Sequence, residues 1–176
     1  MALLPELMRA WRCARDPRLA AALAPFNFPA GGPIWGVGGI EISGAHYQPM
    51  PEGDGALIVS ASRRLRIVDL VACRLKDRRI ATRLGTAAVL GEDWLDLARR
   101  EGMRLPLFSD PLRWLAAGQR GAVILDWYLV PALLDGVPAI GCDSPALARR
   151  VHTLTRRLAA PPTLHLWPKR SPAHAA

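Results

Sequence analysis

The chain has 176 residues, of which 51% are hydrophobic and 22% charged, and its formal net charge is +8 at pH 7. This balance is typical of a folded globular domain and excludes a disordered or low-complexity polypeptide. The three cysteines are widely spaced and form no CxxC pair, so the sequence supports neither a disulfide framework nor a zinc site.

The start of the chain predicts neither a membrane span nor a secretory signal. The uncharged run at residues 19–40 is long enough to cross a bilayer, but three prolines and a Gly–Gly pair would break such a helix. We interpret this run as a linker. Glu6 and the arginines after it interrupt the apolar core that a signal peptide needs. We therefore expect a cytoplasmic protein that makes no membrane contact.

Two helices are expected before the linker. Leu4, Leu7, Met8 and Trp11 recur at helical spacing, which predicts an amphipathic helix packed on the core. An Asp–Pro pair then favours the start of a second, alanine-rich helix over residues 18–25.

Residues 34–90 predict a small antiparallel β-meander, because short β-branched and aliphatic runs alternate with turn sequences. We expect four strands, at residues 34–42, 56–61, 65–75 and 80–90. Asp69 interrupts the apolar run of the third strand. We interpret it as a bulge or hydrogen-bonded edge residue rather than a catalyst.

Three further helices are marked by their end signals. The first is expected to begin at Asp93 and to end at Gly102, since a glycine in that position favours a helix stop. Asp–Pro at residues 110–111 and Ser–Pro at residues 144–145 predict the starts of the other two, and Gly118 the end of the second.

The C-terminal part of the chain carries charge of one sign, with no Asp or Glu after residue 143. An apolar stripe from Leu147 to Leu158 predicts that the last helix packs one side and presents arginines on the other. Such a segment favours polyanionic partners, with nucleic acid ahead of an anionic membrane. The alternative is an ordinary solvated helix face. The residues expected to contact nucleic acid are Arg149, Arg150, Arg156, Arg157, Lys169 and Arg170.

The six tryptophans are candidates for stacking on bases. Trp11, Trp94 and Trp114 lie on the apolar faces of predicted helices, so we expect them in the core. Trp127 and Trp167 remain as candidate ligand contacts.

The sequence lacks the motifs of the common nucleotide, serine-hydrolase, zinc-protease and calcium sites. The glycines at residues 36–39 do not form a dinucleotide-binding loop, because strand-like residues rather than a helix follow them. The four histidines stand singly. We therefore predict no catalytic residue, no metal site and no cofactor.

Residues 121–158 read as strand, acid, helix, strand, helix, with Asp126 at the end of the first strand and Asp143 after the second. The stretch GAVILDWYLVPALLDGVPAIGCDSPALARRV resembles the opening βαβα unit of the Toprim fold of primases and topoisomerases. The resemblance implies that Asp126 stands where the family has a glutamate followed by glycine. Because Trp127 follows here and the later paired aspartates of the Mg²⁺ site are missing, it implies a member without catalysis. From its position alone, Asp126 also suits the cap of the following helix.

Together these observations predict a single α+β domain over residues 1–168, followed by a flexible basic tail at residues 169–176. It comprises N-terminal helices, a small antiparallel β-meander and a C-terminal βαβα unit. The leading hypothesis is a non-enzymatic accessory protein that contacts nucleic acid, or a replication-type nucleoprotein partner, through its last helix. One alternative is an enzyme or small-ligand-binding protein with a pocket at the strand ends near Asp126 and Asp143. Another is a structural subunit that binds a second protein through apolar faces.

Overall fold

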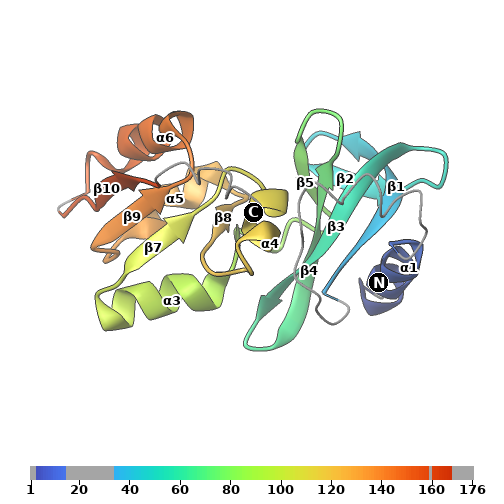
Figure 1. The fold of residues 1–176 in the computed structure, drawn as a ribbon, viewed down its shortest axis with the longest axis horizontal. Helices are drawn as coiled ribbons and strands as arrows, with labels where there is room; N and C mark the ends of the chain where they lie inside the picture. Colours follow the sequence, from blue (N-terminus) through green and yellow to red (C-terminus); the bar gives the residue numbers. More distant parts are fainter. Residues whose placement is uncertain (1–2, 15–33, 159, 168–176) are drawn as a thin grey trace, which may run out of the picture.

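The computed structural model describes residues 3–14, 34–158 and 160–167. Helices and strands are both present, as expected for an α+β protein, and they form a barrel at one end of the molecule and an α/β layer at the other (Figure 1). The predicted helix at residues 18–25 lies outside the described residues. Within the described ranges no helix has the length and apolar character needed to cross a membrane.

Helix α1 (Leu3–Cys13) confirms the predicted N-terminal helix, but it faces the core differently from the prediction. Glu6, Leu7 and Ala10 are buried, whereas Leu4 is 56% exposed. Glu6 is turned inward because its carboxylate accepts hydrogen bonds from the Tyr47 hydroxyl at 2.8 Å and from Arg83 Nε at 3.1 Å. A buried acid needs such partners, and they outweigh the burial of one more leucine.

In place of the expected four-stranded antiparallel meander there is a closed five-stranded barrel, in the order β1-β2-β5-β4-β3. The sequence did not indicate β2, because only one of its four residues is buried, nor the parallel pairing of His46 with Thr82 that closes the barrel. Side chains from all five strands, with Leu7 and Ala10 of α1, form the interior cluster. The strands are β1 (Trp35–Ser43), β2 (His46–Pro49), β3 (Asp54–Arg63), β4 (Arg66–Arg74) and β5 (Ile80–Thr82).

Gly36 allows α1 to lie directly on β1. A Cβ at Gly36 would lie 2.1 Å from the carbonyl carbon of Ala10, a contact that no side chain can make without moving the helix. The glycine-rich run at residues 36–39 lies in strand β1, as predicted. At Gly36 the missing side chain permits the close approach of the two backbones.

Asp69 is hydrogen-bonded and lies at a bulge, as predicted, but it is not an edge residue, because β4 is paired on both sides in the closed barrel. The β3–β4 register shifts between Ala61 and Ser62, opposite Asp69, and the Asp69 side chain is fully buried. Its carboxylate accepts hydrogen bonds from several backbone N–H groups of residues 83–87. These bonds turn the chain away from the barrel, so the single strand predicted at residues 80–90 is wrong. It is divided into β5 and β6 (Val89–Leu90).

The predicted end signals hold for most of the later helices. Asp110 and Ser144 are side-chain N-caps, and Gly102 is the C-cap of α3. Asp93 is not an N-cap, because Gly91 in a left-handed conformation takes that position and places Asp93 in the first turn. The remaining elements are α3 (Glu92–Glu101), β7 (Arg104–Leu107), α4 (Pro111–Ala116), β8 (Val123–Ile124), the 3₁₀ helix η2 (Trp127–Leu129), α5 (Val130–Leu134), β9 (Ala139–Cys142), α6 (Pro145–Thr155) and β10 (Thr163–Leu166).

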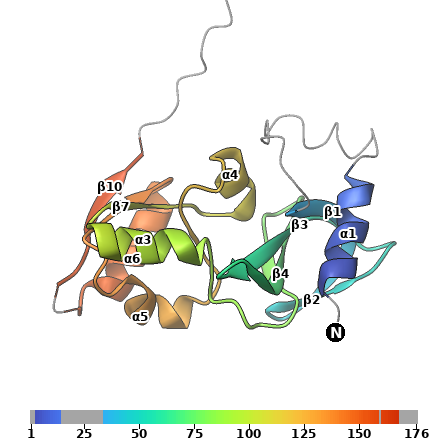
Figure 2. The same ribbon diagram turned by 90° about the horizontal axis from the view of Figure 1, so that it is seen from below.

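The α/β layer is built on a parallel sheet of order β10-β9-β7. A parallel bridge from Leu107 to Ala122 joins β7 to the start of β8, which pairs with β6. The predicted order of elements in residues 121–158 is thus present, but β7 lies between its two strands. Helices α3, α5 and α6 lie on one face of the sheet (Figure 2). There they cover alternate strand residues such as Leu105 and Ile140.

One hydrophobic cluster joins the barrel to the α/β layer. The outer face of the barrel contributes Leu57, Val59 and Val71, and the same cluster contains Leu112 of α4 and Val123 of β8. Strands β3 and β4 are therefore buried on both faces, which explains their nearly continuous apolar sequences.

Candidate nucleic-acid interface

Helix α6 packs one side and exposes the other, as its sequence predicted. The Ser144 hydroxyl accepts a hydrogen bond from the Leu147 N–H and fixes the start of the helix. Leu147 and Val151 are buried in the core of the α/β layer. The four arginines of the helix and of the turn after it are all exposed. They are Arg149, Arg150, Arg156 and Arg157.

These four arginines are not neutralised by carboxylates. Among the residues that the structure describes, none of the four has an acidic oxygen within 4.0 Å, whereas Arg63, Arg74 and Arg83 of the barrel all form ion pairs. From residue 144 to residue 167 the chain has no Asp or Glu at all. The exposed side of α6 is therefore a cationic ridge, defined by these four arginines.

The Arg150 side chain stacks on the ring of Trp127 in the 3₁₀ helix η2. Its guanidinium carbon lies 3.6 Å from the centroid of the Trp127 ring, which is the distance of a close cation–π stack. Trp127 is half-buried and packs on the core of the α/β layer, so the stack holds Arg150 in one place on the ridge.

Asp126 is a helix cap, as predicted, and it fixes the turn that carries Trp127 and Tyr128. One oxygen of its carboxylate accepts a hydrogen bond of 2.9 Å from the Tyr128 N–H, which makes Asp126 the N-cap of η2. Because Trp127 and Tyr128 are adjacent in this tight turn, they cannot both face the core. Trp127 packs inward, and Tyr128 is 96% exposed.

Two hollows meet at these aromatic residues. The first, of about 420 Å³, lies between the barrel and η2 and is lined by His46, Thr82 and Asp126. The second, of about 440 Å³, runs along α6. Trp127, Tyr128 and Arg150 line both hollows.

Asp143 does not join Asp126. It lies after β9, where its carboxylate accepts hydrogen bonds from the Ser109 N–H at 2.9 Å, the Ser109 hydroxyl at 2.5 Å and Arg113 at 3.2 Å. Asp143 is not among the residues that line the hollow at Asp126. With Asp126 acting as a helix cap, this separation argues against a pocket built on the two acids.

The other candidate tryptophans lie in the core or against the sheet. Trp114 is buried and donates a hydrogen bond to the carbonyl of Gly121, whereas Trp94 is half-buried against the core of the α/β layer. Trp167 lies on the sheet, where its indole N–H donates to the Gly141 carbonyl at 2.7 Å, although it remains 42% exposed. The candidate residues Lys169 and Arg170 lie outside the described residues.

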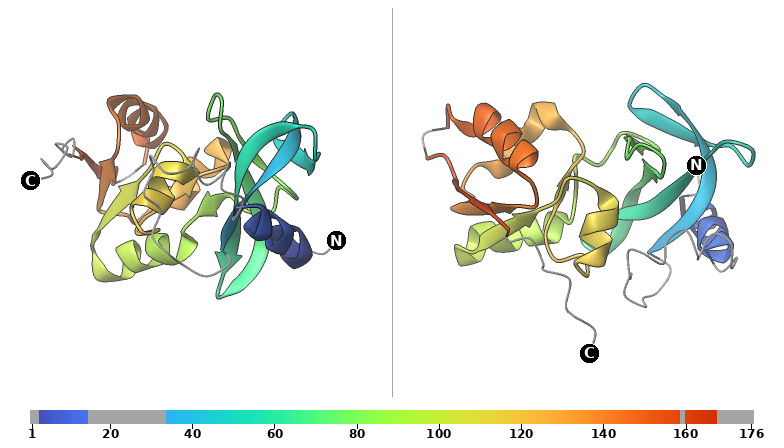
Figure 3. Two further views of the ribbon diagram at one scale, coloured as in Figure 1. Left: turned by 45° about the vertical axis from the view of Figure 1, so that its right-hand side comes forward. Right: turned by 45° about the horizontal axis from the view of Figure 1, so that its top comes forward.

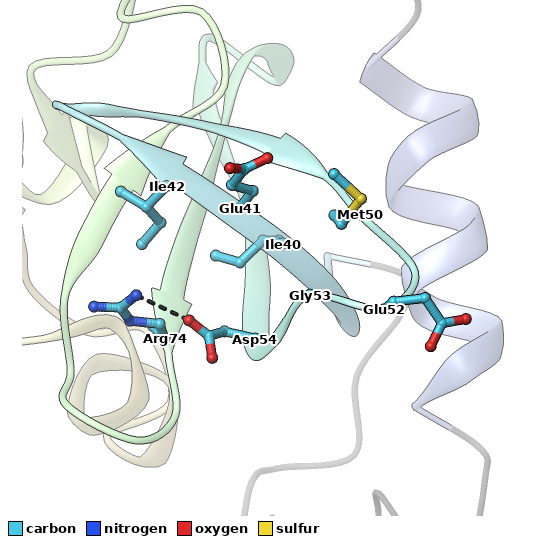
Figure 4. A pocket seen from close by; sticks show the side chains of 8 residues that line it. All are labelled: Ile40, Glu41, Ile42, Met50, Glu52, Gly53, Asp54 and Arg74. Carbon is cyan, nitrogen blue, oxygen red and sulfur yellow. Dashed lines mark hydrogen bonds and ion pairs between the residues drawn. The ribbon is translucent and has the colours of Figure 1, made fainter.

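A hollow on the barrel has the opposite charge character. It measures about 460 Å³, and its lining includes the acids Glu41, Glu52 and Asp54 together with Arg74 (Figure 4). Hydrogen bonds from Lys76 and Arg74 lower the pKa of Asp54, so this carboxylate is held as an anion within an ion-pair network. No group of His, Cys, Asp or Glu in the described part of the chain is arranged to hold a metal ion.

Comparison of the chain with protein-family models, curated proteins and solved structures gave no match. The Toprim resemblance of residues 121–158 therefore stays a prediction.

Sequence reasoning found the arginines and Trp127 but not Tyr128 or His46. The signal for Tyr128 was present, because a capping Asp followed by two aromatic residues leaves one of them outside the core. His46 gave no signal, since it reaches the hollow only through the closure of the barrel.

Proposed function

We propose that this protein is a non-enzymatic accessory protein that contacts nucleic acid, directly or within a replication-type nucleoprotein assembly. The observation that carries the proposal is the cationic ridge: four exposed arginines without carboxylate partners in the described structure. Arginine presents a planar fork of N–H donors that matches phosphate oxygens. Four such groups on one helix and its following turn suit a phosphate backbone better than a single small anion.

The contrast with paired arginines elsewhere in the described structure supports this choice of partner. Ion pairs with nearby acids balance arginines in both parts of the described structure, among them Arg74 and Arg83 near the barrel and Arg99 and Arg113 in the α/β layer. The ridge has no such ion pairs in the described structure, and α6, which carries it, lies at the far end of the molecule from α1 (Figure 3). The resemblance of residues 121–158 to Toprim domains agrees with a nucleic-acid partner. Asp126, as a helix cap, has no metal role in this proposal.

The test is the salt dependence of binding, measured by fluorescence anisotropy on labelled DNA and RNA. Removing one arginine that binds a phosphate of a single strand reduces the slope of log K against log salt by about 0.7. Replacing Arg149, Arg150, Arg156 and Arg157 by Ala is therefore expected to reduce the slope by up to about 3 and to weaken binding strongly at low salt.

The matched control removes the same amount of charge from other surfaces. Arg9 and Arg12 of α1, Arg66 of β4 and Arg120 after α4 are exposed, and their replacement by Ala is expected to leave most of the slope intact. Absence of binding at low salt, or equal reductions of affinity in the two quadruple variants, would contradict the proposal.

A further inference from the structure

We infer that the site at η2 and α6 takes unpaired bases of a single-stranded nucleic acid, with Tyr128 and the Trp127–Arg150 stack as the stacking surfaces. This inference rests on the proposed function, and it specifies which form of nucleic acid the cationic ridge holds. Its starting point is the exposure of Tyr128, whose ring the fold leaves almost entirely in water.

Tyr128 is exposed but held in place. The backbone on which it stands is fixed by the Asp126 cap before it and by buried Val130 after it. An aromatic side chain on a rigid turn loses little conformational entropy when a flat ligand covers it. The exposed ring therefore has the properties of a stacking platform rather than of a loose surface residue.

The neighbouring stack offers a second flat surface at the same place. The Arg150 guanidinium carbon lies 3.6 Å from the centroid of the Trp127 ring, and arginine planes stack on bases as aromatic rings do. Trp127, Tyr128 and Arg150 line both hollows, of about 420 and 440 Å³, so there is open space for a base beside these surfaces.

These surfaces require bases whose faces are free. In a duplex each base is stacked between its neighbours, and a protein side chain reaches only its edges. In a single strand the bases can turn outward onto aromatic groups while the backbone follows a positive groove. The arrangement of the ridge beside Tyr128 fits the second case.

The charges around the Trp127–Arg150 stack also indicate how the bound nucleic-acid strand is oriented. The Asp126 carboxylate lines the hollow toward the barrel and repels phosphate there, whereas Arg149, Arg156 and Arg157 lie on or after α6. We therefore place the phosphates along α6 and the bases toward η2.

The experiment compares three probes on the full chain by fluorescence anisotropy at low salt. They are a deoxycytidine strand of about 15 nucleotides, an abasic strand of the same length and charge, and the corresponding duplex. Wild-type protein is expected to bind the deoxycytidine strand about 10-fold more tightly than the abasic strand, because stacking adds to the phosphate contacts.

The variant Tyr128→Ala is expected to weaken binding of the deoxycytidine strand about 5-fold or more and to leave the abasic strand unaffected. Tyr128→Phe keeps the ring and should retain tight binding. Leu129→Ala, at a neighbouring exposed residue of η2, should change neither affinity.

The possible outcomes separate the two proposals. Equal affinity for all three probes, with no effect of Tyr128→Ala, would overturn the inference and leave the proposed function standing. An equal weakening on the deoxycytidine and abasic strands would show that Tyr128 acts through the fold, which also overturns the inference. No binding of any probe would overturn both.

Discussion

At the scale of single residues, Asp69 shows how one buried carboxylate organises a loop. Its oxygens accept from the N–H groups of Leu70, Arg83, Leu84 and Thr86, at distances of 2.8 to 3.1 Å. A buried acid of this kind is tolerated only because these hydrogen bonds replace its lost hydration. The turn between the barrel and the α/β layer therefore depends on one side chain.

Replacing Asp69 by Ala is expected to lower the free energy of unfolding by about 3 kcal/mol or more, because several buried N–H groups lose their acceptor. Urea unfolding followed by circular dichroism measures the change. The control Thr86→Val removes only the hydroxyl that donates to Val68 and Asp69, and should cost about 1 kcal/mol. Similar destabilisation in the two variants would contradict this role of Asp69.

The candidate site could be predicted in part at the residue scale. Both the one-sided charge of the last helix and the capping role of Asp126 could be predicted from the sequence. The separation of Asp126 from Asp143 could not be predicted. It depends on Ser109 and Arg113, which lie beside Asp143 because β7 is placed between β8 and β9 in the sheet.

At the scale of elements, helix α1 can lie directly on strand β1 because Gly36 has no side chain. Gly36→Ala is expected to destabilise the protein by about 1–3 kcal/mol, since the added methyl group would meet the helix backbone at Ala10. The measurement is again the free energy of unfolding.

The matched control for this contact is Gly55→Ala on strand β3. A Cβ there would have its nearest neighbour at 3.9 Å, an ordinary contact, so stability should be unchanged or slightly higher. If Gly36→Ala were as harmless as Gly55→Ala, α1 would not be held against β1 as described.

Most elements could be predicted because their signals are local. Caps at Asp110 and Ser144, the stop at Gly102 and the apolar runs of β3 and β4 depend only on nearby residues. Strand β2 could not be predicted, since three of its four residues face solvent and its pairing partners lie elsewhere in the chain. The orientation of α1 was missed for the same reason, as Tyr47 and Arg83 decide it from a distance.

At the scale of the whole molecule, the cluster shared by barrel and α/β layer predicts that the two parts unfold together. Leu112 is fully buried in that cluster, between the outer face of the barrel and β8. Leu112→Ala is therefore expected to lower the free energy of unfolding by about 2–5 kcal/mol and to leave a single transition.

Circular dichroism and tryptophan fluorescence, recorded on the same samples, should give coincident midpoints for wild type and Leu112→Ala. Leu4→Ala on the exposed side of α1 serves as the control and should change stability by less than about 0.5 kcal/mol. Two separate transitions in the wild-type protein would show that the shared cluster does not couple the parts.

Positive charge is concentrated locally on α6, where no acidic oxygen of the described residues lies within 4.0 Å of the four arginines. A polyanion that approaches this helix is attracted by the local field before the surfaces touch, so encounters at α6 are more frequent than diffusion alone would give. Diffusive capture would then be fast in dilute buffer and slow steeply as added salt shortens the range of that field.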